Sequence, residues 1–306
     1  MDVKIKVSVH MITYGHELYI KQAIESVLMQ ETNFDFELFI ADDCSPDKTP
    51  EVVESILRNH PQAFRIKYHR HKKNIGMKAN GLYALDQCLG KYIAFCEGDD
   101  YWTDPHKLQK QVDFLENNTN YSICWTKYLI KQESQNLLPL EKPDWISHIE
   151  KDKNFHIDLN NIFAPYCTYT LTAVLRRNML DFTILRKLKH SKDNSIYALC
   201  LSKGNGMLMD FYSSAYRVHG GGIFSGASIY KQKFYSYLNL KEIILKVPDC
   251  DNDNIRSIRN HLLKESIKFC PNRYSFDYLN LIWDFAVCFG FKKSLKLVVN
   301  KLKNGK

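Results

Sequence analysis

The chain alternates between short apolar runs and amphipathic segments over its first 130 residues. The runs are rich in Ile, Val, Phe and Tyr, which favour β-strands. The segments between them carry apolar residues three and four positions apart, as helices do. Strands are predicted at residues 5–13, 36–41, 64–69, 91–96 and 122–130, and helices at 17–30, 48–59, 77–89 and 105–117. This alternation predicts a Rossmann-like α/β sheet, mostly parallel and flanked by helices.

The alternation ends after residue 130. Residues 131–160 are polar, contain two prolines and predict an irregular connection. The pattern then predicts a strand at 168–176, helices at 178–187 and 194–202, and a strand at 206–218. From about residue 230 it is helical and rich in lysine. We therefore predict a domain over residues 1–225, with halves at 1–130 and 131–225, and a helical, Lys-rich region over 226–306.

Length and composition narrow the class of protein. A chain of 306 residues with 45% hydrophobic residues can bury a full core. Its nine cysteines are odd in number and contain no Cys-x-x-Cys pair, which favours reduced thiols in the cytoplasm. The chain enters a predicted strand at once, without a signal-peptide pattern, and has no run of 18 apolar residues. We expect a cytoplasmic protein.

The formal net charge is +8, and the last residues concentrate it. From Phe291 to the end there are six lysines and no acid, preceded by the aromatic-rich segment 281–291. Two interpretations stay open: an interfacial helix on an anionic membrane, at the inner face of the cell membrane, or a last helix packed on the core with solvated lysines. Nucleic acid is not an expected partner, because the basic residues belong to no recognised binding module.

Acidic residues cluster where two predicted strands end. Glu97, Asp99 and Asp100 directly follow one strand, and Asp42 and Asp43 end another. Carboxylates this close repel one another unless they are protonated, solvated or bridged by a hard cation. The carboxyl ends of parallel strands share one edge, so both groups can face one crevice. The alternative is a pair of ordinary solvated turns.

A basic loop adds a candidate phosphate site. Residues 69–76 carry His, Arg and Lys and lead into the predicted helix that begins at Met77 and includes Lys78. Cationic side chains beside a helix amino terminus suit a phosphate. A solvated run of charge is the alternative.

Five segments together resemble the successive motifs of family 2 glycosyltransferases. They are residues 7–14, 23–30, 40–45, 74–76 and 92–100. They occur in the order and at the spacing of that family, within residues 5–120, and residues 216–222 resemble the segment that closes the catalytic domain in a bacterial branch. The resemblance implies the GT-A fold, a nucleotide-sugar donor, a divalent cation (Mn²⁺ or Mg²⁺) and inversion at the anomeric carbon. It assigns the donor and the cation to the half at residues 1–130 and the acceptor to the half at residues 131–225.

The resemblance also implies roles for individual residues. Asp193, at the start of a predicted helix, matches the catalytic base, although a helix N-cap explains an aspartate there equally well. Asp99, Asp100 and His219 are the implied metal ligands. Glu97 stands where the family has an aspartate. The residues implied to bind the nucleotide sugar are Thr13, Tyr14, Asp42, Asp43, Asn74, Gly76, Lys78, Glu97, Asp99 and Arg217.

The predicted function is transfer of a sugar, from a donor that is UDP-linked by the family's common usage, to a glycan or lipid-linked acceptor. Capsule, O-antigen or other envelope polysaccharide synthesis is the setting that the resemblance implies. Two alternatives stay open. A sugar-1-phosphate nucleotidyltransferase shares a similar sheet but needs a glycine-rich loop after the first strand, where this chain has a single glycine, Gly15. A non-catalytic carbohydrate-binding protein would bind sugar without consuming a donor.

Overall fold

The computed structural model describes residues 5–132, 141–149, 153–163, 167–221 and 226–296. The chain forms two compact units, one of residues 1–187 and 191–219 and the other of residues 188–190 and 220–306. The sequence-based division at residue 225 falls six residues after the first unit ends at His219. The assignment of donor and acceptor halves within that unit stays a prediction.

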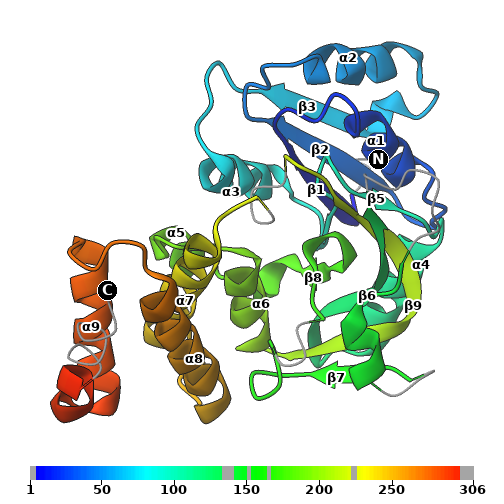
Figure 1. Ribbon diagram of the computed structural model, residues 1–306. Helices are drawn as coiled ribbons and strands as arrows, with labels where there is room; N and C mark the ends of the chain where they lie inside the picture. Colours follow the sequence, from blue (N-terminus) through cyan, green and yellow to red (C-terminus); the bar gives the residue numbers. More distant parts are fainter. Residues whose placement is uncertain (1–4, 133–140, 150–152, 164–166, 222–225, 297–306) are drawn as a thin grey trace. The chain divides into compact units, whose positions relative to one another are not determined.

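The first unit alternates strands and helices, as the sequence pattern predicts (Figure 1). Its strands are β1 (Val7–Thr13), β2 (Phe36–Asp42), β3 (Ile66–Arg70), β4 (Tyr92–Phe95), β5 (Tyr101–Trp102), β6 (Tyr121–Gln132), β7 (Phe155–Ile157), β8 (Val174–Arg176) and β9 (Asn205–Val218). Its helices are α1 (Ile20–Leu28), α2 (Thr49–Asn59), α3 (Met77–Gln87), α4 (Lys107–Asn117), α5 (Phe182–Lys187) and α6 (Asp193–Leu201). Short 3-10 turns lie at Ala63–Arg65, Asp144–His148, Thr170–Thr172 and Arg177–Met179.

The strands form one mixed sheet in the order β3-β2-β1-β4-β8-β6-β9-β5, with β7 paired to β9. β3, β2, β1 and β4 are mutually parallel, whereas β8 is antiparallel to both of its neighbours. The long pair β6 and β9 is parallel again. The parallel half brings the ends of β1, β2 and β4 to one edge, where an open α/β sheet offers a ligand site.

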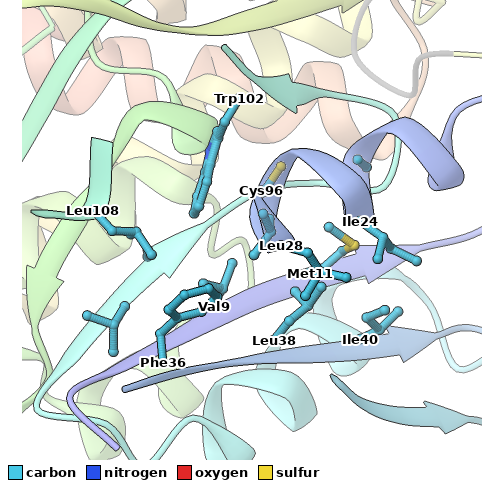
Figure 2. Close-up of a cluster of buried hydrophobic side chains, with 14 of the residues drawn as sticks. Val9, Met11, Ile24, Leu28, Phe36, Leu38, Ile40, Cys96, Trp102 and Leu108 are labelled. Carbon is cyan, nitrogen blue, oxygen red and sulfur yellow. The ribbon is translucent and has the colours of Figure 1, made fainter. Parts of the chain in front are cut away.

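The main core lies between the parallel strands and helices α1, α2 and α4. Alternate residues of β1, such as Val9 and Met11, pack against Ile24 and Leu28 of α1, and Figure 2 shows these side chains with Trp102 beside them. The other face of the strands is covered by α3, where the His10 ring contacts the carbonyl oxygen of Gly81 at 3.0 Å. Both faces are therefore covered, which explains why these strands are nearly continuous apolar runs.

One predicted strand is largely wrong. Residues 168–176 alternate Thr with apolar residues, but only Val174–Arg176 form a strand, and Thr170–Thr172 form a 3-10 turn. The Thr172 hydroxyl and amide both donate to the Tyr169 carbonyl, at 2.7 and 3.0 Å. A side chain that bonds its own local backbone in this way competes with strand pairing.

The second unit contains three long helices, α7 (Ile229–Lys246), α8 (Asp253–Phe269) and α9 (Phe276–Phe289). Each begins with a side-chain cap, from Ser228, Asn252 and Ser275, which accepts an otherwise unpaired amide of the first turn. Their shared core includes Tyr237, Leu263, Ile267, Leu281 and Phe285. Among the described residues, no helix is both long and apolar enough to cross a bilayer.

Candidate active site

The two acidic strand ends meet at Thr13, the last residue of β1. The Thr13 carbonyl accepts the Asp43 amide at 3.0 Å, which ties β1 to the end of β2. On the other side, the Gly98 amide donates to Ile12 at 3.0 Å. A Cβ at Gly98 would lie 2.7 Å from the Thr13 hydroxyl oxygen, so a glycine is needed for this close approach. The structure thus brings both acid groups to one edge of the sheet, as the sequence predicts.

The Asp42 carboxylate is bonded to other residues of the protein. Its side chain is fully buried, Oδ1 accepts the Ser45 amide at 2.7 Å, and Oδ2 accepts the Tyr68 hydroxyl at 2.8 Å. Arg70 lies 4.0 Å from the same carboxylate. Burial, followed by the bond to Asp42, raises the Tyr68 pKa. With both oxygens occupied, Asp42 shapes the turn after β2 rather than presenting its carboxylate to a ligand.

Asp43 organises the loop before α3. Its two oxygens accept the amides of Ile75 at 2.7 Å and Gly76 at 2.9 Å, and Asn74 accepts the Gly76 amide at 3.0 Å. Gly76 has φ +89° and ψ 146°, a conformation available almost only to glycine. Asp43, Asn74 and Gly76, three of the predicted site residues, therefore form one connected group.

Two further predicted residues lie beside this group. Tyr14 follows Thr13 directly and is 46% exposed, so its ring offers a face to a ligand. The turn that carries it is fixed by the Gly15 amide, which donates to the Ser45 hydroxyl at 3.0 Å. Lys78 is the second residue of α3, next to the loop that Asp43 holds.

Asp99 is flanked by two histidines. Its Oδ2 lies 3.1 Å from Nε2 of His219 and 3.7 Å from Nε2 of His16. Burial alone would raise the Asp99 pKa, but the His219 hydrogen bond and the charges of both histidines together hold it below its ordinary value. Asp99 is therefore the ionised member of the cluster.

The other two acids shift in the opposite direction. Burial, with the nearby charges of Asp99 and Asp193, raises the Glu97 pKa to about 8. Burial, then Asp99 and Glu97, raises the Asp100 pKa well above its usual value, although Asp100 accepts the Arg217 amide at 2.8 Å. Carboxylates so placed take up protons or a cation to lower their mutual repulsion.

Arg217 clamps the acidic loop from β9. Its Nε donates to the Asp99 carbonyl at 2.9 Å and a terminal nitrogen donates to Gln22 at 2.7 Å. The guanidinium also lies over the rings of Tyr19 and Tyr101. Arg217 holds the backbone of Asp99 and His219 holds its side chain. The segment that begins at Tyr216 is therefore bonded directly to the acidic loop.

Asp193 lies at the first helical position of α6, and the cap position belongs to Lys192. Asp193 is therefore not the N-cap of α6 but the residue after it. Its Oδ1 accepts the Asn194 amide at 2.9 Å. Its Oδ2 lies 3.5 Å from the Thr170 hydroxyl, which also bonds Glu97. Thr170 thus links Asp193 to the acidic cluster.

Several residues at the site escaped the sequence analysis. His16 is 83 positions from Asp99, and Thr170 lies in the segment predicted as a strand. Tyr169 and Tyr216 pack edge to face, with ring centroids 5.3 Å apart, and burial, then Asp100, raises the Tyr216 pKa. The sequence carried a signal for two of these residues: His16 ends the Thr13–His16 turn that follows the first strand, and Tyr216 begins the segment 216–222 that resembles the family.

The donor set fits a divalent cation bound together with a substrate. Within the described ranges, no three His, Cys, Asp or Glu side chains form a ready-made metal site. Mg²⁺ is commonly held by one or two carboxylates plus substrate phosphates rather than by a protein cage. Asp99 and His219, whose Oδ2 and Nε2 are joined by a 3.1 Å hydrogen bond, would hold such a cation, which would supply Lewis-acid chemistry to the phosphates.

Comparison with known sequences identifies the family. The model of glycosyl transferase family 2 matches residues 8–181. An uncharacterized glycosyltransferase of Methanocaldococcus jannaschii is 30% identical over 244 residues, which cover 77% of this chain and 78% of the relative. An uncharacterized protein of Mycobacterium tuberculosis is 42% identical over 118 residues, which cover 39% of this chain but only 34% of that relative.

Solved structures share the fold. S. aureus TarS residues 1–349, in complex with UDP-GlcNAc, has a TM-score of 0.64 at 20% identity, and the match covers 93% of this chain and 81% of that 1–349 chain. A mannosyltransferase from Pyrobaculum calidifontis, in complex with GDP-Man and Mn²⁺, has a TM-score of 0.60 at 13% identity, covering 98% and 80%. The predicted fold, a GT-A α/β sheet followed by a helical carboxyl-terminal region, is confirmed. The chain belongs to glycosyl transferase family 2.

Proposed function

We propose that the protein is an inverting, metal-dependent glycosyltransferase that moves a sugar from a nucleoside diphosphate sugar to a glycan or lipid-linked acceptor. Support comes chiefly from one observation: Glu97, Asp99 and Asp100 lie at the same sheet edge as Asp43, Thr170 links Glu97 to Asp193, and burial, followed by the charges of neighbouring acids, raises the pKa values of Glu97 and Asp100. The family membership agrees with this activity. TarS with UDP-GlcNAc supports a uridine donor, and the proposed setting is envelope polysaccharide synthesis at the inner face of the cell membrane.

The nucleoside would lie against the β1 and β2 ends. The exposed Tyr14 ring offers a stacking face, and the loop held by Asp43 presents Asn74 and the start of α3. Lys78 and the amino terminus of α3 supply positive charge for the diphosphate. Asp42 contributes by holding the turn.

The diphosphate would lie against Asp99, with His219 and Asp100 beside it. Mn²⁺ or Mg²⁺ bound there would act as a Lewis acid for the charge that develops on the leaving β-phosphate. The mannosyltransferase bound to GDP-Man and Mn²⁺ supports this assignment. Arg217 keeps the Asp99 backbone in place, and His219 keeps Asp99 ionised.

Asp193 would take the proton of the acceptor hydroxyl. That oxygen attacks the anomeric carbon from the face opposite the diphosphate, and the bond to the leaving oxygen breaks with its electron pair on the diphosphate. One displacement of this kind inverts the anomeric carbon. Thr170 is a positioning residue, since its hydroxyl contacts Asp193 and Glu97.

Release of nucleoside diphosphate from a panel of uridine, guanosine and thymidine diphosphate sugars, with Mn²⁺ or with EDTA, tests the proposal. We expect metal-dependent release from one donor, faster with an acceptor sugar. Asp193→Asn should keep donor affinity and slow transfer by about 10²–10⁴-fold, the range for a lost general base. Asn194→Ala, the neighbouring change, should retain most of the rate.

Two results would contradict the proposal. Formation of a nucleotide sugar from sugar 1-phosphate and nucleoside triphosphate would instead identify a nucleotidyltransferase. If the protein binds sugars but consumes no nucleotide-sugar donor, whichever acceptor is supplied, it is a carbohydrate-binding protein.

A further inference from the structure

Helix α9 is apolar on two opposite faces. Tyr278, Leu281 and Phe285 pack into the core of the second unit. On the opposite face, Phe276, Leu279, Trp283 and Val287 are 78%, 59%, 62% and 66% exposed. Spacings of three and four place these four side chains in one row, here called the α9 stripe. A helix with two apolar faces normally has both of them covered, which points to the stripe as an interaction surface.

The apolar surface continues past the end of α9. Gly290, with φ +92°, ends the helix, and residues 291–296 are helical again. Phe291 and Leu295 are 65% and 68% exposed, and the rings of Trp283 and Phe291 meet edge to face with centroids 5.8 Å apart. The exposed row is therefore continuous from Phe276 to Leu295.

The charged residues that follow this row are lysines. Lys292, Lys293 and Lys296 are exposed beside it, and the sequence from Phe291 to Lys306 contains six lysines and no acid. Of the two acids in α9, Asp284 accepts the Lys241 ammonium and the Tyr237 hydroxyl inside the unit, which leaves Asp277 exposed. The complementary partner is apolar and anionic.

We propose that the α9 stripe, with Lys292, Lys293 and Lys296 after it, docks the protein on an anionic lipid bilayer. Lysines, Trp and Phe on one helical surface suit the boundary between headgroups and acyl chains. A helix of 14 residues is about 21 Å long, shorter than the ~30 Å hydrocarbon core, so α9 lies along the surface. The inference stands apart from the proposed transferase activity, since lipid binding needs neither donor nor cation.

Sedimentation of the full chain with phosphatidylglycerol or phosphatidylcholine vesicles tests the surface. We expect binding to phosphatidylglycerol and much weaker binding to phosphatidylcholine. The triple variant L279S/W283S/V287S should weaken binding at least about tenfold through lost apolar burial. The triple variant K292Q/K293Q/K296Q should weaken it on the order of 10²-fold, from about fivefold per lysine.

Matched controls use exposed residues of the first unit. Phe64 is as exposed as Phe276, and Phe64→Ser should leave vesicle binding unchanged. The same holds for K21Q/K48Q/K203Q, which removes the same amount of charge from other exposed positions. Equal losses in the control and test variants would overturn the proposal.

Trp283 gives a readout that needs no destabilising variant. Of the four tryptophans of the chain, Trp102 and Trp125 are fully buried and Trp283 is exposed, and Trp283→Phe isolates the signal of Trp283 from that of the other three. Anionic vesicles with brominated acyl chains should quench and blue-shift the wild-type fluorescence, and Trp283→Phe, which keeps the apolar ring, should lose that response but still sediment. Unchanged wild-type fluorescence would overturn the proposal. So would a lipid-free dimer that the stripe variant converts to monomer, because the occupant would then be a second copy of the chain.

Discussion

Asp42 and Asp43 at the end of β2, and Glu97, Asp99 and Asp100 after β4, meet different partners. The first pair accepts four donors of its own chain, the amides of Ser45, Ile75 and Gly76 and the hydroxyl of Tyr68. The second group is gathered in one place, and there burial and mutual repulsion raise the pKa values of Glu97 and Asp100. Donors of the protein itself satisfy the carboxylates of Asp42 and Asp43. In the cluster of Glu97, Asp99 and Asp100, protons or a cation lower the repulsion between the carboxylates.

This difference shows that an acidic strand end does not fix a role. A carboxylate with all its donors supplied by neighbouring turns stabilises the loop geometry. A carboxylate crowded by others stores repulsion that a charged ligand can relieve. Substitutions in the two groups should therefore affect different quantities, and the following predictions run from the largest expected effect to the smallest.

Asp99→Asn should lower the transfer rate by about 10³-fold, because the ionised ligand beside His219 is lost while its shape is kept. The measurement is nucleoside diphosphate release at saturating Mn²⁺. The matched substitution in the other group, Asp42→Asn, should keep the rate within about tenfold, since its oxygens face the protein. Equal losses in the two variants would remove the distinction between the groups.

Asp42→Ala should lower the free energy of unfolding by about 3 kcal/mol, because it leaves the buried Ser45 amide and the Tyr68 hydroxyl without their acceptor. Urea unfolding measures this. Tyr68→Phe removes one of those bonds together with its donor and should cost only about 1 kcal/mol. If Asp42→Ala unfolds at the wild-type midpoint, Asp42 does not hold the turn.

Glu97 should make the stability of the protein without cation fall with rising pH. A carboxyl whose folded pKa is raised, here to about 8, binds more protons when folded, so its contribution is full below its unfolded pKa, about 4.5, and is lost as pH rises through 8. Relative to Glu97→Gln, the free energy of unfolding of the wild-type protein should fall by roughly 2 kcal/mol between these pH limits. This is less than the full pKa shift of Glu97 would give, because Asp99 and Asp100 share the titration.

The comparison with Glu97→Gln cancels other groups that titrate in the same range. Burial lowers the pKa of His10 to about 4, which makes stability rise with pH between about 4 and 6.5 in both proteins. Unfolding measured at a series of pH values gives the difference directly. A difference that stays constant with pH would mean that Glu97 is ordinarily ionised.

The elements of the parallel half were predictable because both faces of its strands are buried. The strand predicted at 36–41 is Phe36–Asp42, and the helix predicted at 105–117 is Lys107–Asn117. Apolar periodicity reports burial directly, and it failed at 168–176, where the Thr172 hydroxyl bonds the local backbone. The order in which β8, β6 and β9 join the sheet depends on pairing between distant segments, which periodicity does not encode.

The candidate site was predictable as a set of strand-end residues but not as a network. The acidic strand ends supplied Asp43 and Asp99, the parallel sheet predicted that these two share an edge, and the resemblance to the family supplied Asp193. Asp42 and Asp43 have different roles because different donors reach them. One donor to Asp42, the Tyr68 hydroxyl, comes from the neighbouring strand β3, which the local sequence does not reveal. The contact of His16 with Asp99 depends equally on loop packing across β1.

The smallest effect is expected at Cys44, directly after the acid pair of β2. Cys44 has φ +62°, a left-handed conformation that costs a side chain about 1–2 kcal/mol and costs glycine little. Cys44→Gly should be more stable than Cys44→Ala by about 0.5–1 kcal/mol, after subtracting the greater freedom of glycine in the unfolded chain. Both variants lack the thiol, so urea unfolding of the two isolates the backbone effect. If the alanine variant is the more stable, the backbone at residue 44 can leave the left-handed conformation without a cost in free energy. The hydrogen bonds of Asp42 and Asp43 would then not be enough to fix the conformation of this turn.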